Sequence, residues 1–259
     1  MGLYEFDGEK YKRASRGQKE WGSDLMSRLS LDGAEQILDL GCGDGVLTLR
    51  LAVMVPNGTV LGIDGSEGML ATARTSSRPN LEFHKQDIND MDFENSFDVI
   101  YSNAALHWVL DHPRLLAASH RALRTGGIIA WNFAAAGTCG NFFPAVREVM
   151  RKPEYAVHFA EFEWPFYMPA QQEYERLVAE AGFSAYSVDC EKRDRLFTDA
   201  GEMAAWIDQP SIVPFLDVLP QELKPAFRTD VIQRTLDRAL QADGRCLETF
   251  RRLRVMAIK

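Results

Sequence analysis

The sequence lacks the features of a secreted, membrane-spanning or metal-dependent protein. Its four cysteines, Cys42, Cys139, Cys190 and Cys246, lie far apart and form no Cys-x-x-Cys pair, so we expect reduced thiols and neither a zinc nor a redox centre. No apolar run reaches the roughly 18 residues of a membrane-spanning helix. The first residues lack the basic start and apolar stretch that are typical of a signal peptide. These absences predict a cytoplasmic protein with no metal and no membrane partner.

An excess of positive charge is also missing. The 259 residues include 37 Asp and Glu against 29 Lys and Arg, which gives a formal net charge of -8. Such a negative field disfavours nucleic acid as a partner. Two short basic clusters, at 10–16 and 251–254, are typical of solvated surface. We therefore expect a small-molecule partner, while the pattern leaves monomer and homodimer equally open.

Short apolar runs alternate with helical patterns from residue 35 onward. The runs predict strands at 36–40, 59–64, 81–85, 97–102 and 127–133. Pro113 suits the first turn of a helix over 114–123, and the glycines after Thr125 indicate the end of that helix. Strands joined by helical crossovers pair in parallel and are covered on both faces. The pattern predicts an α/β, Rossmann-like, doubly wound fold.

The alternation stops after Phe133, where an aromatic-rich segment follows between residues 142 and 167. We interpret this segment as an inserted cap. Further elements are expected as a helix over 171–181, a strand over 183–191, a helix over 198–207 capped by Thr198, a helix opened by Pro220 and reaching residue 239, and a strand-like run over 246–258.

A glycine-rich turn, Asp39-Leu40-Gly41-Cys42-Gly43-Asp44-Gly45, follows the first expected strand. A dinucleotide-binding turn needs a third small residue where this chain has Val46. Carboxylates beside the turn would also repel a pyrophosphate placed at the helix N-terminus. They would attract a sulfonium and an ammonium instead. The turn therefore favours a cationic cofactor without phosphate.

Two further acids follow the next strands. Asp64 lies about 20 residues beyond the turn, where a carboxylate can accept from both ribose hydroxyls. Asp87 follows the third strand and could accept from an adenine amino group, with Ile88 packing on the ring. Either acid could instead cap a helix, and Ser66 is itself a candidate cap. Both interpretations stay open at this point.

Together with the segment from Asn103 to Trp108 after the fourth strand, these residues resemble the class I S-adenosylmethionine-dependent methyltransferases, and more narrowly the trans-aconitate methyltransferase group. The resemblance covers about residues 36–133. It implies S-adenosyl-L-methionine as the cofactor. The cofactor-binding residues that follow from it are Gln18, Asp39, Gly41, Cys42, Gly43, Asp64, Gly65, Ser66, Met69, Asp87, Ile88, Asn103, Ala104 and Trp108.

The resemblance also implies features of the fold that the periodicity of the sequence does not predict. It implies that the last strand runs antiparallel and completes a mostly parallel, seven-stranded sheet. It implies an N-terminal helical arm over the cofactor site, with Tyr11, Ser15, Gln18 and Trp21 as its contacts. We accordingly expect an arm at 1–34, a cofactor-binding core at 35–133, and the rest of the sheet with an inserted helical substrate cap at 134–259.

The expected reaction needs little acid or base chemistry. Methyl transfer from a sulfonium is an in-line displacement, for which alignment and a water-poor pocket supply the rate. A carboxylate acceptor, with a pKa near 4, is already ionised and needs orientation only. We therefore expect O-methylation of a small carboxylic acid, like trans-aconitate. His107 is the candidate for a catalytic polar group facing the methyl, although it could equally be a packed surface histidine.

Several alternatives remain at the level of sequence. Arg147, Arg151, His158 and Arg195 could grip an acidic acceptor or could be surface charges. The acceptor could also be an amine or a hydroxyl. A nicotinamide-dependent oxidoreductase shares the fold pattern and Asp64, and a protein that binds the cofactor without transferring its methyl group would have the same motifs.

Overall fold

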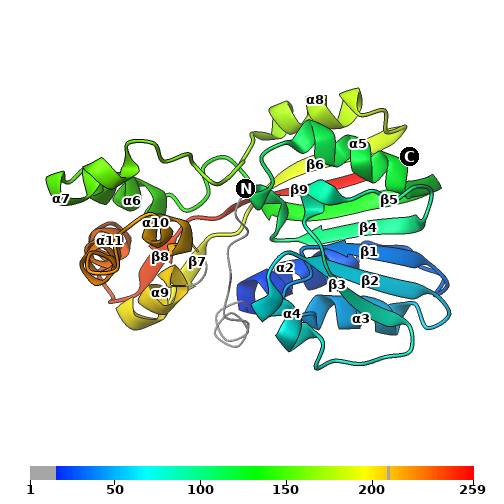
Figure 1. Ribbon diagram of the computed structural model, residues 1–259, viewed down its shortest axis with the longest axis horizontal. Coiled ribbons are helices and arrows are strands. Elements are labelled where there is room, and N and C mark those ends of the chain that lie inside the picture. The colour runs from blue at the N-terminus through cyan, green and yellow to red at the C-terminus, as the bar shows by residue number, and fades with distance from the viewer. Residues whose placement is uncertain (1–15, 209–210) are drawn as a thin grey trace. The chain divides into compact units, whose positions relative to one another are not determined.

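The computed structural model describes residues 16–208 and 211–259, and the chain divides into two compact units (Figure 1). Among the described residues, unit 1 comprises 16–136, 166–191 and 252–259, and unit 2 comprises 137–165, 192–208 and 211–251. Tyr11 and Ser15, expected in the N-terminal arm, lie outside the described residues. None of the described helices is both long and apolar enough to cross a membrane.

The described part of unit 1 is built on a seven-stranded sheet with the order β3-β2-β1-β4-β5-β9-β6. β1 pairs in parallel with β2 and β4, β2 with β3, and β4 with β5, whereas β9 runs antiparallel to β5. This confirms the Rossmann-like fold and its antiparallel last strand. The strands are β1 (Gln36–Leu40), β2 (Thr59–Asp64), β3 (Leu81–Lys85), β4 (Phe97–Asn103), β5 (Leu123–Ala134), β6 (Ala185–Lys192) and β9 (Arg251–Ile258).

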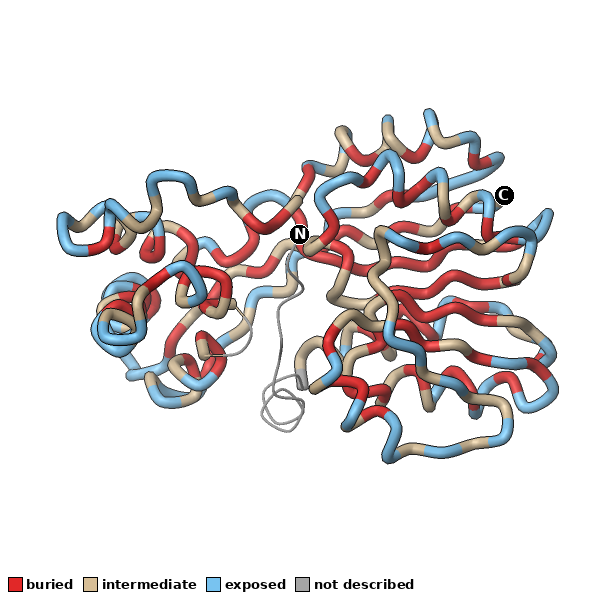
Figure 2. Tube along the Cα trace, viewed as in Figure 1, coloured by how far each residue is buried: buried red, intermediate tan, exposed pale blue. Residues whose placement is uncertain are grey.

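Helices cover both faces of this sheet, because successive strand residues point to opposite sides. On one face Leu38 and Leu40 belong to a core with residues of α5 (His112–Ala122) and α8 (Gln171–Glu180). On the other face Ile37 belongs to a core with residues of α2 (Arg16–Met26) and α3 (Val46–Met54). The central strands β1 and β4 are accordingly buried along most of their length, as Figure 2 shows, whereas the edge strands β3 and β6 are mostly half-buried or exposed. The sheet is thus a rigid platform for the loops at its ends.

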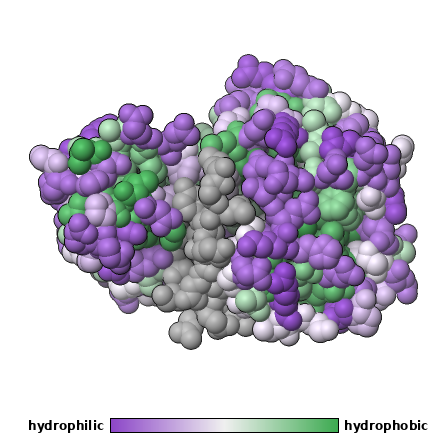
Figure 3. All heavy atoms as spheres, in the orientation of Figure 1, coloured by the Kyte–Doolittle hydropathy of each residue, from purple (hydrophilic) through white to green (hydrophobic). Residues whose placement is uncertain are grey.

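Helix α8 has one side buried against the core and one side facing solvent. Tyr174 and Val178 are its buried residues, whereas its outer side is hydrophilic (Figure 3). The remaining helices of unit 1 are α4 (Glu67–Ala73) and the short 3-10 turns η1 (Ile88–Asp90) and η2 (Leu106–Trp108). Both turns follow sheet strands at the edge where the glycine-rich turn lies.

Unit 2 is mostly helical. Phe142 packs against Trp206 and Phe215, with ring centroids 5.8 Å and 6.4 Å away, so much of the predicted aromatic segment forms this unit's own core. Its elements are α6 (Phe142–Met150), α7 (Pro153–Ala156), η3 (Val157–Phe159), β7 (Arg195–Phe197), α9 (Ala200–Ile207), α10 (Val213–Asp217), α11 (Lys224–Ala239) and β8 (Cys246–Glu248), with β7 and β8 antiparallel.

The fifth strand begins earlier than the sequence pattern predicts. It starts at Leu123, so the glycines interpreted as a helix end lie within β5. Gly126 has a φ of 79° and donates its N–H to the carbonyl of Lys259. Because this partner is far away in the sequence, local pattern could not reveal the extension. The preceding helix correspondingly ends at Ala122.

Three element ends in the second half also differ from expectation. Asp199, and not Thr198, caps α9 by accepting from Glu202 N. The helix expected from Pro220 begins only at Lys224, with a proline in its first turn. The run over 246–258 is two strands, β8 and β9, which belong to different sheets.

Candidate functional site

The glycine-rich turn joins β1 to α3 in a backbone conformation that requires glycine. Gly41, Gly43 and Gly45 have φ values of 70°, 56° and 74°, in the left-handed region that other residues rarely adopt. A Cβ on Gly41 would also lie 2.2 Å from the Cβ of Ala105. The turn therefore packs its backbone directly against the segment that follows β4.

Two carboxylates of the turn lie in contrasting surroundings. Asp39 is 2% exposed and accepts a hydrogen bond from Thr48 Oγ1 at 2.8 Å. Burial raises the pKa of Asp39 from 3.8 to about 7, and the nearby charge of Asp64 raises it further. Asp44 instead forms an ion pair, with its Oδ2 2.7 Å from Lys19 Nζ. Burial also raises the pKa of the Cys42 thiol, which is therefore neutral.

Asp64 ties the end of β2 to the turn. Its Oδ2 accepts from Gly43 N at 2.8 Å, and its Oδ1 accepts from Ser66 N at 2.9 Å, across Gly65. Ser66 caps α4 by accepting from the N–H of Met69, which is itself buried. The cap function thus belongs to Ser66, and the Asp64 carboxylate lies beside the glycine-turn backbone.

Asp87 caps the short turn η1. Its Oδ1 accepts from Asn89 N at 2.9 Å and from Asn89 Nδ2 at 2.8 Å. Asp87 therefore acts as a cap through Oδ1. Its other carboxylate oxygen, Oδ2, takes part in neither of these two hydrogen bonds. Ile88 is half-buried, and its Cδ1 lies 3.8 Å from a Cβ placed on Gly41. Ile88 thus borders the turn, as a residue packed on an adenine ring would.

The segment after β4 completes this edge. Asn103 Nδ2 donates to the carbonyl of Gln18 at 2.9 Å, whereas Asn103 Oδ1 is buried without a partner among the described residues. Ala104 has a φ of 61° and donates its N–H to the carbonyl of Asn132 at 2.7 Å. The ring of Trp108 packs against Phe166.

A hollow lies where these elements meet at the carboxyl ends of the parallel strands. Ligands of open α/β sheets bind at this edge. The hollow is lined by Gln18, Lys19, Asp39, Gly41, Cys42, Gly43, Asp44, Leu47, Tyr101 and Asn103. The structure therefore brings helix α2, the glycine-rich turn and the end of β4 around one space.

Comparison with known proteins agrees with this geometry. Residues 37–127 match a family model described as a methyltransferase domain. A trans-aconitate 2-methyltransferase of Delftia acidovorans is 31% identical over 263 residues, covering 95% of this chain and 96% of that protein. The chain belongs to the class I S-adenosylmethionine-dependent methyltransferases.

Other relatives of this methyltransferase match over a smaller part or at lower identity. A trans-aconitate 2-methyltransferase of Deinococcus radiodurans is 43% identical over 122 residues, which are 47% of this chain and 46% of that protein. The fold is similar to that of phosphoethanolamine N-methyltransferase 2 of Haemonchus contortus, with a TM-score of 0.63 and 18% identity, covering 97% of this chain and 57% of that one.

The residues of the methyltransferase fit its cofactor. The hollow is lined by Asp39 and by Asp44, which pairs with Lys19, and these acidic side chains suit a ligand with a sulfonium and an ammonium. Asn103 Oδ1, buried without a partner among the described residues, offers a further acceptor. A pyrophosphate would meet the same carboxylates unfavourably. The nicotinamide alternative is therefore set aside, and the cofactor is S-adenosyl-L-methionine.

Lys19 is a member of this site that the sequence pattern missed. It is one residue from Gln18 on α2, and its ammonium joins Asp44 in the hollow. The methionyl end of the cofactor carries a carboxylate as well as an ammonium, so Lys19 could hold the carboxylate. A solitary lysine in an amphipathic helix gives no signal for this, because its partner lies 25 residues away.

His107 is half-buried and packs against aromatic rings. Its ring lies beside those of Trp108 and Phe166, with centroids 5.6 Å and 6.1 Å away, and its Nδ1 is buried without a partner among the described residues. Burial, with smaller effects of Arg252 and His112, lowers the pKa of His107 from 6.5 to about 3. The imidazole is therefore neutral and a poor base.

Arg252 is buried, which corrects the expectation that the basic cluster 251–254 is solvated surface. The side chain is 4% exposed. Its Nε donates to Asn132 Oδ1 at 2.7 Å, and its Nη2 donates to the Asn132 carbonyl at 2.9 Å. Its Cζ lies 4.7 Å from the ring centroid of Trp21. Arg254 instead pairs with Asp189 and Glu191.

The four cations that could grip an acceptor or could be surface charges all lie in unit 2. Arg147 lies over the ring of Trp164, with Cζ 4.0 Å from the centroid. Arg195 pairs with Glu202 at 2.6 Å. Arg151 is exposed and His158 is half-buried. Arg147 and Arg195 thus each contact a residue outside this group of four cations.

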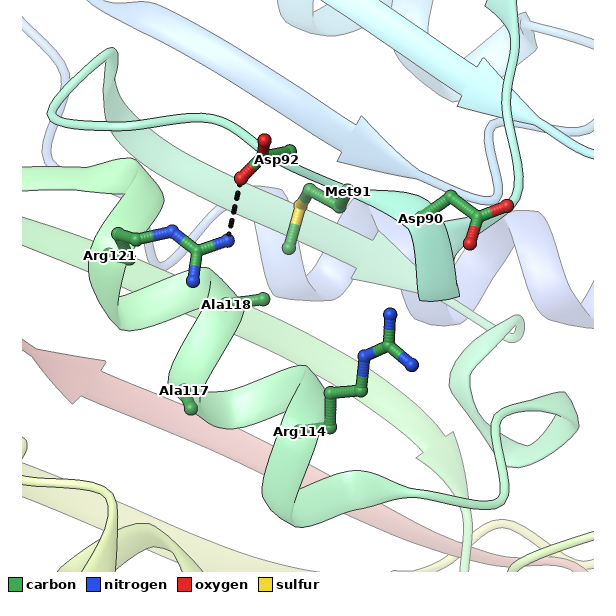
Figure 4. A pocket seen from close by; sticks show the side chains of 7 residues that line it. All are labelled: Asp90, Met91, Asp92, Arg114, Ala117, Ala118 and Arg121. Carbon is green, nitrogen blue, oxygen red and sulfur yellow. Dashed lines mark hydrogen bonds and ion pairs between the residues drawn. The ribbon is translucent and has the colours of Figure 1, made fainter.

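A second hollow of about 410 Å³ lies between the η1 segment and α5 (Figure 4). Arg121 reaches across it to Asp92, with Nη2 3.0 Å from Oδ1, and Arg114 points toward the segment of Asp90. Two arginines and two aspartates balance their charges here. This hollow contains none of the predicted site residues.

Proposed function

We propose that this methyltransferase transfers the methyl group to a carboxylate oxygen of a small organic acid of the trans-aconitate kind. The observation that carries the proposal is the fixed, buried Arg252 guanidinium whose charge acts on a neutral His107. The names of the relatives, one of them 31% identical over nearly the whole chain, support the same acceptor class.

The chemistry suits an acceptor that is already ionised. S-adenosylmethionine supplies an activated methyl group: the bond from sulfur to methyl breaks as the carboxylate oxygen bonds the methyl, and no proton moves. The protein supplies orientation through Arg252 and the neutral imidazole of His107. Trp21, Trp108 and Phe166 supply apolar walls that exclude water. A hydroxyl acceptor would need a base, and an imidazole with a pKa of about 3 performs poorly in that role.

The proposal also covers the substrate cap, the N-terminal arm and the place of action in the cell. The helical cap within 134–259 would add selectivity for the acceptor, and the arm of residues 1–34 would cover the cofactor. The cofactor-binding residues that the family resemblance implies would hold S-adenosylmethionine. The enzyme would act in the cytoplasm as a monomer or homodimer, with no nucleic-acid partner.

The proposal is tested with labelled S-adenosylmethionine and a panel of di- and tricarboxylates, each matched with an amine and a hydroxyl of the same carbon skeleton. We expect base-labile methyl esters from the acids only. Base-stable label on the amine or hydroxyl compounds, without ester from any acid, would contradict the proposal.

A matched pair of glycine variants provides the control for the cofactor site. Gly41→Ala should abolish labelling, because the added Cβ would meet Ala105 at 2.2 Å. Gly126→Ala places a Cβ on a residue of similar positive φ with nothing within 4 Å. It should retain labelling, since only the local backbone preference changes.

A further inference from the structure

We propose that the hollow between the η1 segment and α5 binds a small zwitterion, namely an α-amino acid with an apolar side chain, and that this binding is coupled to cofactor binding. The inference goes beyond the proposed function, since it does not depend on which acceptor is methylated. The hollow has a volume of about 410 Å³, and all of its lining residues belong to unit 1. This volume falls within the roughly 300 to 1,000 Å³ of pockets for small molecules.

Arg114 supplies the hollow with a cation that has no partner in the described part of the chain. It is exposed on α5, and its side chain points toward the segment of Asp90 (Figure 4). Its backbone N–H donates to Asp111 Oδ1 at 3.0 Å, but no hydrogen bond or ion pair among the described residues involves its guanidinium. The planar fork of donors is therefore open to a ligand, and it suits a carboxylate.

Asp90 supplies the opposite charge from the other side of the hollow. Its carbonyl accepts from Gln86 Nε2 at 3.2 Å, whereas its carboxylate takes part in no hydrogen bond or ion pair with a described residue. In particular, Asp90 and Arg114 do not pair with each other. The two charges thus face the same space from η1 and from α5, with a gap between them that a ligand can bridge.

The second pair of charges in the hollow is already joined. Arg121 Nη2 lies 3.0 Å from Asp92 Oδ1, so these two side chains neutralise each other. A simple anion would be attracted by Arg114 and repelled by Asp90, and a simple cation would meet the reverse. A molecule that carries both charges meets an opposite charge at each end. The charge pattern therefore favours a zwitterion over an ion of one sign.

The surface between the charged ends is apolar. Met91 is 4% exposed and belongs to the core, and the half-buried Ala118 packs against that core. Figure 4 shows the Met91 side chain and the Ala118 methyl group between Arg114 and Arg121. An apolar ligand side chain would cover these groups and remove them from water. This surface therefore selects amino acids with apolar side chains over small polar zwitterions.

The hollow shares the turn η1 with the cofactor side of unit 1. Asp90 is the last residue of η1, and Ile88, the first, has its Cδ1 3.8 Å from a Cβ placed on Gly41. Asp90 N donates to the carbonyl of Asp87, the predicted adenine contact, at 3.0 Å. A ligand that holds Asp90 would restrain Asp87 and Ile88 as well. Because two ligands that order one turn share its entropic cost, each should tighten the binding of the other by the same factor.

The test measures binding of L-leucine, L-methionine and L-phenylalanine by calorimetry, each beside the analogues that lack its ammonium or its carboxylate; for leucine these are isocaproate and isopentylamine. The variants are Arg114→Gln, Asp90→Asn and Ala118→Leu, the last of which keeps every charge and fills the hollow. Arg176→Gln is the matched control, since Arg176 is an exposed arginine of α8 that has no printed pairing with a described residue and does not line the hollow. Thermal melting reports on the folding of each variant.

We expect at least one of the amino acids to bind the wild type with a Kd on the order of 1 mM or below. Its two singly charged analogues should bind at least about fivefold more weakly. Arg114→Gln, Asp90→Asn and Ala118→Leu should each weaken binding by about fivefold or more, because each removes a charged hydrogen bond or the space. Arg176→Gln should leave binding within about twofold. A saturating amino acid should tighten S-adenosylhomocysteine binding by about fivefold.

Absence of binding by all three amino acids would overturn the assignment, and so would equal binding of an amino acid and its singly charged analogues or an equal effect of Arg176→Gln. Unchanged S-adenosylhomocysteine affinity at a saturating amino acid would overturn the coupling through η1. Ester formation by the wild type is measured separately, so these outcomes leave the proposed function standing, and its failure would leave the amino acid site standing. Should Ala118→Leu fail to fold, the variants of the exposed Arg114 and Asp90 decide.

Discussion

The carboxyl group of Asp39 is buried and lines the hollow at the glycine-rich turn. Among the described residues, the Thr48 hydroxyl acts in the opposite sense, and it lowers the pKa of Asp39 less than burial raises it. Near pH 7 a substantial fraction of Asp39 is therefore protonated in the free protein. A cofactor that carries an ammonium favours the ionised form, so binding and deprotonation are coupled.

We predict that S-adenosylhomocysteine binds more tightly as the pH rises from about 5 to 7, by up to about tenfold per pH unit well below the pKa of Asp39. Calorimetry in buffers of different ionisation enthalpy should detect proton release on binding. The stability of the free protein should change in the opposite sense, because a carboxyl group with a raised pKa loses stability as pH rises through that pKa.

Asp39→Asn should remove this dependence, and Asp98→Asn should keep it. Asp98 is a suitable control because it lies at the first residues of β4, where it accepts from Gln36 N and Arg124. Identical pH profiles for wild type and Asp39→Asn would contradict the coupling.

At the scale of elements, the short turn η2 carries His107 and Trp108. It is held by His112, which is fully buried at the start of α5. His112 Nε2 lies 3.0 Å from the Leu106 carbonyl, and Nδ1 lies 2.8 Å from the Tyr174 hydroxyl of α8. This pairing assigns Nε2 as donor and Nδ1 as acceptor. Two helices thus set the position of one site turn.

His112→Phe should lower the free energy of unfolding by about 1 to 3 kcal/mol, because it leaves the Leu106 carbonyl and Tyr174 hydroxyl buried without their partner. Urea unfolding measures this change. His120→Phe on the same helix is the control, since His120 packs edge-on against Phe183 and should cost less than about 0.5 kcal/mol. Equal costs for both variants would count against the role of His112.

At the scale of the whole molecule, each unit has its own core and its own internal support. In unit 2 this support includes Glu248, which has no exposed surface. It accepts from Asn141 N at 3.0 Å and from Phe142 N at 2.9 Å at the start of α6. Burial still raises the pKa of Glu248, which shows that these donors only partly offset its desolvation.

Glu248→Ala should weaken unit 2 selectively, by about 1 to 3 kcal/mol for the buried N–H groups left without an acceptor. Hydrogen exchange should show faster exchange in α6 and unchanged exchange in β1, β2 and β4. Glu248→Gln should have a smaller effect, because it keeps one acceptor oxygen. Equally faster exchange in both units would show that Glu248 supports the whole chain.

Much of the fold and of the cofactor site could be read from local pattern. The first three strands lie where apolar runs predict them, and β4 is one residue longer than expected. The glycines of the turn were identifiable because backbone conformation restricts residue type. Asp64 and Ser66 were both identified, but only the structure assigned the helix cap to Ser66.

The sequence by itself determined the alternating α/β order, the turn and the acids that follow the strands, because each depends on neighbours close in the chain. Tertiary structure alone decided that Lys19 meets Asp44, that β5 starts at Leu123, and that one arginine of an apparently solvated cluster is buried against Asn132, 120 residues away. Charge pairing and burial depend on which distant residues come together, and periodicity carries no information about those partners.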